Sequence, residues 1–353
     1  MRYGIAISTW NSRLILIAAG VVVILLAFAP VIAPRSLIQD LILIFVMCAI
    51  AQCWNLLAGY AGLISVGQQA FVGLGGYGLF ALIILAGVDP LLAVLLAAII
   101  GTLIAIPVGL LMFRLQGAYF AVGTWVVAEV FRLLLAQWKA LGGGTGNSLP
   151  RTATTEMFGL STINALFGVR NAVGREIVIY WAALALAAAV VGASYLLLRS
   201  RIGLALSAVR DGETAAESVG VDITRTKFAV YVFAAFGASL AGALYFLDSA
   251  RISPDSAFTV LDWTAYVIFI VVIGGIGTIE GPILGSIIFV VLQSSLSDYG
   301  PWYLILLGVL GIAVMLVAPR GLWGTFSDLT GIHLLPTRRR LVPLGETPPT
   351  REA

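Results

Sequence analysis

The stretch RIGLALSAVRDGETAAESVGVDITRTK, Arg201–Lys227, is an island of charge in a chain of 353 residues of which only 10% are charged. Apolar runs of membrane-spanning length flank it on both sides, near 177–198 and 228–247. Because charged side chains are costly inside the hydrocarbon of a bilayer, this segment predicts an aqueous loop between two membrane spans.

The composition of the whole chain predicts an all-α integral membrane protein. Hydrophobic residues make up 60% of the sequence and the mean hydropathy is +1.05, which is more apolar surface than one soluble core of this length can bury. A helix needs roughly 20 mostly apolar residues to cross the hydrocarbon, and about ten such segments can be placed. They lie near 14–33, 37–58, 63–86, 91–113, 117–136, 177–198, 228–247, 262–278, 281–297 and 301–318.

The distribution of basic residues orients these spans. An even number of spans puts both termini on one side, and 13 of the 20 Lys and Arg residues fall on that side. They are Arg2, Arg13, Arg114, Arg199, Arg201, Arg210, Arg225, Lys227, Arg320, Arg338, Arg339, Arg340 and Arg351. Since cytoplasmic segments next to spans carry an excess of Lys and Arg, we expect a multi-pass protein with both termini and the 199–227 loop in the cytoplasm.

The predicted transmembrane domain, residues 1–325, contains a long outer loop and is followed by a tail. The loop at about 137–176 contains the Gly-, Ser- and Thr-rich LGGGTGNSLPRTATT and falls on the outer side, where we expect a lid or docking surface. The tail 326–353 is rich in Pro and Arg and lacks apolar periodicity, which predicts a flexible segment. Its run Arg338–Arg340 is expected to meet anionic lipid head groups.

The sequence argues against an enzyme. It contains no G-x-x-x-x-G-K-[ST] phosphate-binding loop, so this chain is not expected to hydrolyse ATP itself. The single histidine, His333, lies in the tail, and Cys48 and Cys53 lie inside one apolar run, where we expect them to pack. No cluster of His, Cys and carboxylates has metal-ligand spacing. We therefore expect no catalytic residue and no metal or cofactor bound by this chain.

Few polar groups fall inside the predicted spans. Glu129 and Arg132 stand three residues apart on a helix, which favours an internal ion pair near a span end over a substrate site. The block NLLAGYAGLISVGQQAFVGLGGYG, residues 55–78, carries seven glycines, which let helices approach closely or interrupt a helix in the membrane. Because buried amides need partners, its polar side chains are candidates for lining a polar path. They are Asn55, Ser65, Gln68, Gln69 and Tyr77.

A second Gly-rich block, VVIGGIGTIEGPILGS, spans Val271–Ser286. Gly281-Pro282 predicts a turn between the eighth and ninth spans, on the cytoplasmic side. Glu280 is then expected to be solvated or docked to a partner.

The pattern inside Arg201–Lys227 predicts two helical pieces. Residues 203–210 are expected to be helical, followed by a turn at Asp211-Gly212. Thr214 and Glu217 fit a capping box at the start of a short helix, and Gly220 suits its end because glycine tolerates the left-handed conformation required there. A plain connecting loop would not need such start and stop signals.

These segments resemble the permease subunits of ABC importers for branched-chain amino acids. Importer permeases carry a cytoplasmic E-A-A-x-x-x-G loop whose short coupling helix docks in a cleft of the ATPase, and TAAESVG, Thr214–Gly220, matches it except that Thr214 replaces the glutamate. The two Gly-rich blocks and APRGLWG, Ala318–Gly324, resemble further family stretches, although Gln68 stands where members often have histidine. The length, the ten spans and the outer loop resemble the larger, M-type, of two paired permeases.

The resemblance implies a transport subunit that binds no cofactor, in a bacterial inner membrane. It implies as partners a second homologous permease, two ABC ATPase subunits that use ATP and Mg, and a periplasmic binding protein that delivers Leu, Ile or Val; no nucleic acid is implied. The coupling loop would supply the ATPase contacts. These residues are Arg210, Asp211, Glu213, Thr214, Ala215, Ala216, Glu217 and Gly220.

Three other functions stay open at this point. The same class of importer also carries urea or short-chain amides. A cation-coupled secondary carrier would be expected to show membrane-embedded carboxylates. A passive channel, like the carrier, would give no reason for a short cytoplasmic helix with its own start and stop.

Overall fold

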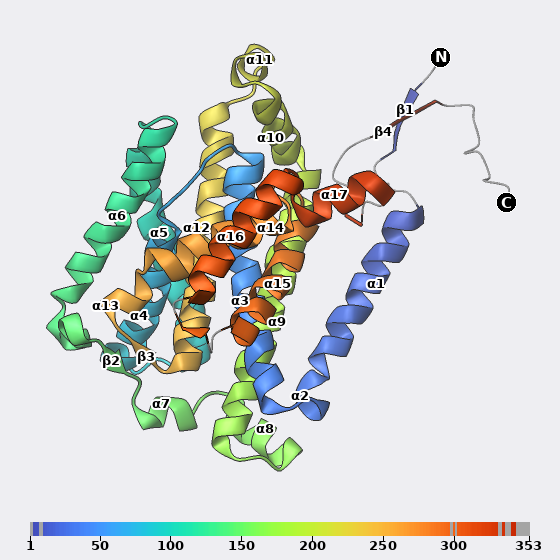
Figure 1. Ribbon diagram of the computed structural model, residues 1–353. Helices are drawn as coiled ribbons and strands as arrows, with labels where there is room; N and C mark the ends of the chain where they lie inside the picture. Colours follow the sequence, from blue (N-terminus) through green and yellow to red (C-terminus); the bar gives the residue numbers. More distant parts are fainter. Residues whose placement is uncertain are drawn as a thin grey trace.

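The computed structural model describes residues 3–6, 10–296, 299–300, 302–330, 334–335 and 340–343. In this part of the chain the protein is a helix bundle with two small antiparallel sheets, β1 with β4 and β2 with β3 (Figure 1). Eight helices are long and apolar enough to cross a membrane, and Ile17–Ile32 and Glu280–Leu296 are shorter apolar helices. The all-helical membrane class is therefore confirmed, while the count of ten spans stays a prediction.

The first half of the chain supplies a run of near-parallel helices and the segments that join them. Its elements are β1 (Tyr3–Ala6), α1 (Trp10–Ala27), α2 (Ala29–Ile32), α3 (Arg35–Asn55), the π-helical turn η1 (Leu56–Tyr60), α4 (Gln68–Ala86), α5 (Pro90–Met112), α6 (Ala118–Ala136), the 3-10 turns η2 (Lys139–Leu141) and η3 (Gly143–Thr145), β2 (Asn147–Ser148), α7 (Arg151–Thr155) and α8 (Leu160–Phe167).

The second half completes the bundle. It contains α9 (Asn171–Arg199), α10 (Arg201–Asp211), α11 (Glu213–Ser218), α12 (Ile223–Ser249), β3 (Arg251–Ile252), α13 (Pro254–Ala257), the π-helical turn η4 (Leu261–Ala265), α14 (Tyr266–Gly274), α15 (Glu280–Leu296), α16 (Trp302–Val317), α17 (Gly321–Thr330) and β4 (Arg340–Pro343).

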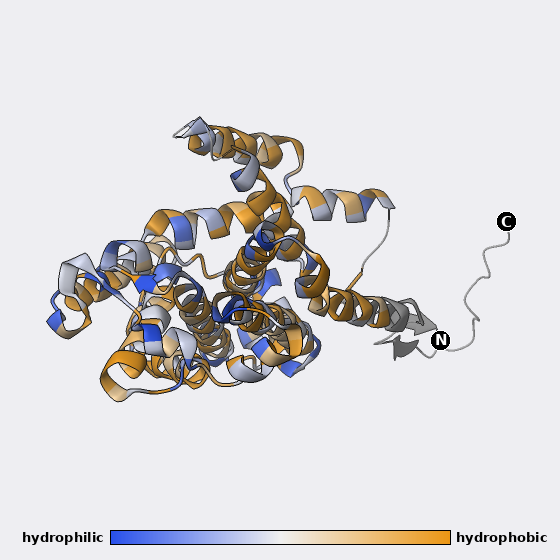
Figure 2. Cartoon of the chain, turned by 90° about the horizontal axis from the view of Figure 1, so that it is seen from below, coloured by the Kyte–Doolittle hydropathy of each residue, from blue (hydrophilic) through white to orange (hydrophobic). Residues whose placement is uncertain are grey.

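The connecting segments divide between two ends of the bundle. α10, α11, α17 and the β1–β4 pair lie at one end, called here the α11 end, whereas α7, α8 and β2 lie at the other, the α8 end (Figure 1). Because β1 pairs with β4, these two segments, which are near the two ends of the chain, lie together at the α11 end (Figure 1). Figure 2 views the α8 end, where hydrophilic residues gather in the connecting segments and the helices behind are largely hydrophobic.

The outward surface of several helices is apolar, as lipid requires. Leu110 on α5, Leu134 on α6 and Leu316 on α16 are all more than half exposed, and no polar residue shields them. In water such a surface would be costly, but in a bilayer these side chains face acyl chains of the same polarity. The exposed leucines therefore agree with a multi-pass membrane protein.

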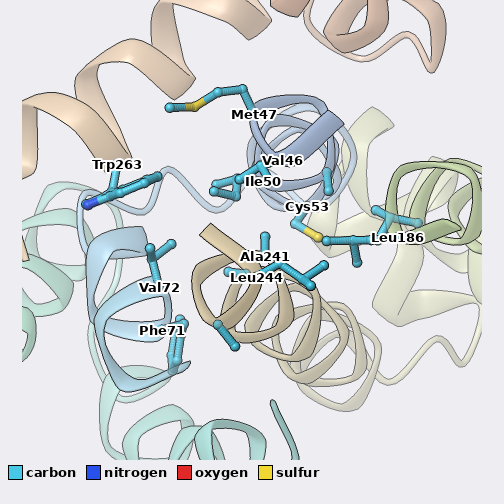
Figure 3. Close-up of a cluster of buried hydrophobic side chains, with 14 of the residues drawn as sticks. Val46, Met47, Ile50, Cys53, Phe71, Val72, Leu186, Ala241, Leu244 and Trp263 are labelled. Atoms are coloured by element: carbon cyan, nitrogen blue, oxygen red, sulfur yellow. The ribbon is translucent and has the colours of Figure 1, made fainter. Parts of the chain in front are cut away.

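The core forms where α12 runs between α3, α4, α5 and α9. Figure 3 shows Ile50 and Cys53 of α3, Val72 of α4, Leu186 of α9 and Leu244 of α12 converging on this helix. All but Leu186 are at most 3% exposed. Both cysteines are buried and free, so they pack as expected.

The turn predicted at Gly281-Pro282 lies elsewhere. Both residues belong to the first turn of α15, where proline is tolerated because its missing N–H would have no helical partner there. The chain reverses at residues 275–279 instead, and Gly277 adopts a left-handed φ of 75° that favours glycine. Glu280 is half-buried, and its Oε1 accepts a hydrogen bond from the Leu335 backbone N–H at 2.6 Å.

The predicted outer loop and tail are only partly irregular. The loop contains η2, η3, β2, α7 and α8, and β2 pairs with β3 across Asn147 and Ile252. Helix α17 continues to Thr330, past the predicted start of the tail at 326. His333, Arg338 and Arg339 lie outside the described residues, so the flexibility and lipid contact predicted for the tail stay predictions.

Close contact between α4 and α12 depends on glycine, which gives a test of the fold. A Cβ at Gly242 would lie 2.2 Å from the Val72 carbonyl oxygen, whereas a Cβ at Gly192 on α9 would meet nothing within 4 Å. We expect Gly242→Ala to destabilise the protein in detergent by about 1–3 kcal/mol through overpacking. Gly192→Ala is the matched control and should leave the thermal unfolding midpoint unchanged or raised. Equal midpoints for the two variants would contradict this packing.

Candidate functional site

The polar side chains predicted to line a path are all withdrawn from the surface. Asn55, Ser65, Gln68, Gln69 and Tyr77 are each at most 2% exposed. Asn55, Ser65, Gln68 and Gln69 lie at or beside a break between two helices, whereas Tyr77 lies further along α4. At this break α3 ends in the π-helical turn η1, residues 61–67 are mostly irregular, and α4 begins at Gln68. The sequence left open whether the seven glycines pack helices closely or interrupt a helix, and the irregular segment corresponds to an interruption.

Neighbouring side chains satisfy the irregular backbone of this interruption. The Trp54 indole N–H donates to the Ser65 carbonyl oxygen at 2.8 Å, and the Val66 N–H donates to the Thr124 hydroxyl of α6 at 3.2 Å. Non-helical backbone is tolerated at membrane depth only where protein or water supplies such partners. Hydrogen bonds from α3 and α6 therefore hold the interrupted segment in a defined conformation.

The two adjacent glutamines of the block have different surroundings. The Thr264 hydroxyl of η4 donates to the Gln69 side-chain oxygen, so this amide ties α4 to η4. Within the described residues, neither the nitrogen nor the oxygen of the Gln68 amide has a hydrogen-bond partner, and the Tyr77 hydroxyl also has none. A buried amide without partners carries a desolvation cost of about 1–3 kcal/mol.

Sequence reasoning missed a second orphaned amide. Gln52 of α3 is fully buried, and both of its side-chain polar atoms have no partner among the described residues. Gln52 stands three residues before Asn55, on the same helical face. Gln52 could have been found from the sequence because it is a polar residue in the apolar stretch FVMCAIAQCWN, Phe45–Asn55.

Asn55 joins the two Gly-rich blocks at the α11 end. Its amide N–H donates to the Thr278 carbonyl oxygen at 2.7 Å, and its side-chain oxygen accepts from the Gly277 N–H at 2.8 Å. A Cβ at Gly59 would lie 2.6 Å from the Gly277 nitrogen. We call the contact of Asn55 and Gly59 with residues 275–279 the glycine junction. The sequence located both blocks but did not indicate that they meet.

The segment Arg201–Lys227 folds into two short helices, α10 and α11, as predicted. Gly212 lies between them, and the helical piece extends from Arg201 to Asp211. The end of α11 also follows the prediction: Gly220 has a φ of 87°, its N–H donates to Glu217, and the Val221 N–H donates to Ala216. This pair of bonds is the Schellman arrangement in which a left-handed glycine closes a helix.

The start of α11 corrects the predicted capping box. The helix begins at Glu213 with Gly212 as its N-cap, so Thr214 lies inside the first turn and no side chain caps this end. The nearly extended backbone of Gly212, with ψ 119°, starts the helix two residues early. Glu213 is then free to pair with Lys227.

One ion pair fastens α11 to the long helix α12. The Lys227 Nζ lies 2.7 Å from Glu213 Oε1, and the Lys227 side chain is only 11% exposed. The Asp222 side chain caps α12 by accepting from the Arg225 N–H at 2.9 Å. Ala216 is buried at 2% exposure, so one face of α11 packs inward while the other stays open.

The open face of α11 forms the far tip of the protein at this end (Figure 1). Thr214, Ala215, Glu217 and Gly220 are exposed, and Val219 is 75% exposed. Of the other residues predicted at this contact, Arg210, Asp211 and Glu213 are also exposed. The tip is therefore a projecting surface on a short, well-terminated helix.

The pair Glu129–Arg132 forms the internal ion pair that the sequence predicts. Arg132 Nη2 lies 2.6 Å from Glu129 Oε1, and Arg132 Nη1 lies 2.8 Å from Asp255 Oδ1. Sequence reasoning missed Asp255, which follows β3 in a segment far along the chain. The Asp255 side chain is 82% exposed, so the cluster lies at the surface of the bundle and links α6 to α13.

No group of His, Cys, Asp and Glu in the described part of the chain is arranged to hold a metal ion. The arrangement instead combines a projecting short helix at one end with buried amides at a helix interruption.

Comparison with known proteins gives a consistent result. The family described as "Branched-chain amino acid transport system / permease component" matches residues 36–318. The high-affinity branched-chain amino acid transport system permease protein LivM of Salmonella typhimurium is 30% identical over 280 residues, which cover 76% of this chain but 65% of that protein. The chain thus spans slightly less than two thirds of this relative.

Two further relatives carry the same description. LivM of Escherichia coli is 29% identical over 339 residues, 89% of this chain and 76% of that protein. The probable branched-chain amino acid transport permease protein LivM of Methanocaldococcus jannaschii is 27% identical over 209 residues, 59% of this chain and 56% of that protein. No solved structure matches the chain.

The ion pair between α11 and α12 can be tested by a double-mutant cycle. We expect Lys227→Ala and Glu213→Ala each to lower thermal stability in detergent, and the double variant to lose less than the sum. The coupling energy should be about 1–3 kcal/mol, because the pair is charged, hydrogen-bonded and half-buried. Thermal unfolding of all four proteins measures it. Strict additivity would show that the two side chains do not interact.

Proposed function

Because the chain belongs to the family of branched-chain amino acid transport permeases, we propose that it is the membrane-spanning permease subunit of an ATP-driven importer for leucine, isoleucine and valine. The family match over residues 36–318 carries this proposal. The chain itself is a transport subunit and not an enzyme. ATP hydrolysis is assigned to partner subunits, since the sequence contains no phosphate-binding loop.

The tip of α11 is proposed as the contact with the ATPase. Two features support it: the tip projects beyond the other helices, and its end is closed by the Gly220 turn, which keeps the exposed face in one shape. Arg210, Asp211, Glu213 and Glu217 would supply polar contacts. The buried side of α11, fixed by Ala216 and Lys227, would pass force from the ATPase into α12.

The proposed setting follows from the two ends of the bundle. The α11 end is assigned to the cytoplasm because it carries the excess of basic residues. The α8 end would then meet a periplasmic binding protein, and the protein would lie in a bacterial inner membrane beside a second homologous permease. A pair of ATPase subunits, with ATP and Mg, would complete the importer.

The substrate path is proposed to pass the helix interruption at residues 61–67. Gln68 supports this most strongly, because a fully buried amide without partners is costly unless a passing solute or water uses it. Ser65 and Gln69 lie at or beside the same interruption, and Tyr77 lies further along α4. A path of this kind orients a polar solute without tight binding, so selectivity can reside in the binding protein.

Reconstitution tests the function directly. The complex of this chain with its ATPases, second permease and binding protein is placed in vesicles, and labelled leucine uptake is followed. We expect uptake to require both ATP and the binding protein. Uptake by this chain alone, driven by an ion gradient, would contradict the importer, whereas ATP-dependent uptake of urea or a short-chain amide in place of leucine would change only the cargo.

The role of the tip gives a second prediction. Glu217→Arg and Gly220→Trp should lower ATP-dependent leucine uptake by more than about tenfold, equal to about 1.4 kcal/mol of coupling. Membrane insertion should be unchanged because both positions are exposed. Arg201→Ala, an exposed change in the same loop but away from the tip, is the control. Unchanged uptake in both tip variants would exclude α11 as the ATPase contact.

The path gives a third prediction. Gln68→Met keeps the side-chain volume and removes the orphaned amide, so thermal stability should stay the same or rise by about 1 kcal/mol. Leucine uptake should nevertheless fall severalfold if the amide meets the solute. Gln293→Met on α15, whose side-chain oxygen also lacks a partner, is the matched control. Normal uptake by Gln68→Met would make Gln68 a packing residue.

A further inference from the structure

The glycine junction lies where four parts of the α11 end touch. Asn55 and Gly59 reach it from the end of α3, and residues 275–279 reach it from the α14–α15 connection. The Arg210 Nη1 of α10 lies 3.7 Å from the position of a Cβ on Gly277. From the other side, a Cβ on Gly321 of α17 would lie 2.4 Å from the Gly275 Cα.

We propose that Asn55 is a positioning residue that couples the ATPase-driven movement of α10 and α11 to the helix interruption beside Gln68. This role rests on the proposed importer function and differs from a place in the substrate path. It requires three properties: a rigid contact from α10 to the junction, a rigid contact from the junction to α3, and continuity from α3 to the interruption.

The first contact combines helix packing with the approach of one side chain. Helix α10 lies against η1, which contains Gly59 of the glycine junction. Gly277 has a φ of 75°, and Arg210 Nη1 lies 3.7 Å from the position that a Cβ of Gly277 would take. Since close-packed atoms transmit a displacement almost without compression, a shift of α10 reaches the junction through η1. Any residue other than glycine at 277 would be strained by this φ.

The second contact uses both polar atoms of the Asn55 side chain. The amide nitrogen donates to the Thr278 carbonyl oxygen at 2.7 Å, and the amide oxygen accepts from the Gly277 N–H at 2.8 Å. The side chain is therefore hydrogen-bonded to the backbone of the turn at two adjacent residues. Asn55 is fully buried, where a lost hydrogen bond cannot be replaced by bulk water. Both polar atoms of the Asn55 side chain are therefore directed at the turn.

Only a few residues connect Asn55 to the proposed substrate path. Asn55 is followed at once by η1 and the irregular segment 61–67, and its neighbour Trp54 donates to the Ser65 carbonyl oxygen at 2.8 Å. A π-helical turn such as η1 is a local irregularity found mostly at functional sites. Movement of the turn 275–279 is thus carried by Asn55 to the segment that ends at Gln68.

The test measures the number of leucine molecules imported per ATP hydrolysed, in the reconstituted complete complex. Asn55→Ala should lower this ratio at least about fivefold, the change expected from losing a buried hydrogen bond of ordinary strength, while the ATPase subunits stay bound and hydrolyse ATP. Arg210→Ala should lower it as well, whereas Arg201→Ala, the matched exposed arginine on α10, should not. The two effects should be less than additive in the double variant, because both act through Gly277.

The outcomes separate the two proposals. If the unmodified complex fails to import leucine, the proposed function is wrong. If it imports leucine and Asn55→Ala changes the uptake and ATP hydrolysis in proportion, or fully additive losses are found, Asn55 is only a structural residue and the inference is overturned. If Asn55→Ala does not fold, Arg210→Ala decides: a normal ratio, or loss of uptake through failure to bind the ATPases, overturns the inference.

Discussion

The structure depends on one constraint: every backbone N–H and C=O inside the bundle must find a partner without the help of bulk water. Regular helices meet this demand on their own, but the chain leaves helical geometry at 61–67 and at 275–279. Side chains complete these places, with Trp54 and Thr124 at the first and Asn55 at the second. Each irregular segment is therefore fixed to a neighbouring helix, and the adjacent residues Trp54 and Asn55 serve one segment each.

Much of the fold could be predicted because a bilayer requires long apolar segments, which can be identified in a sequence. Apolar length marked the long helices to within a few residues, and the glycine content of residues 55–78 indicated the interruption that η1 and 61–67 form. The stop of α11 was predictable since the left-handed conformation of Gly220 is rarely adopted by other residues. The pairing of β1 with β4 brings segments near the two ends of the chain together, on the same side of the bundle as the even count of apolar segments predicts.

The rest could not be predicted because it depends on contacts between distant segments. Thr214 has the residue type of an N-cap, but Gly212 starts α11 earlier, which places Glu213 where it pairs with Lys227. Asn55 reads from sequence as a path residue, yet a segment more than 200 positions away uses both of its amide groups. Arg132 finds Asp255 in the same way. No local sequence pattern predicts hydrogen-bond or ion-pair partners that lie so far along the chain.

The central claim is that the α11 tip and the glycine junction move as one unit relative to the rest of the bundle. Spin labels at Ser218 on α11, at Ile276 in the turn and at Tyr119 at the start of α6 test it, since all three positions are exposed. Between the nucleotide-free and ATP-trapped complexes, the Ser218–Ile276 distance should stay constant while both distances to Tyr119 change. A change in the Ser218–Ile276 distance as large as the others would contradict the account.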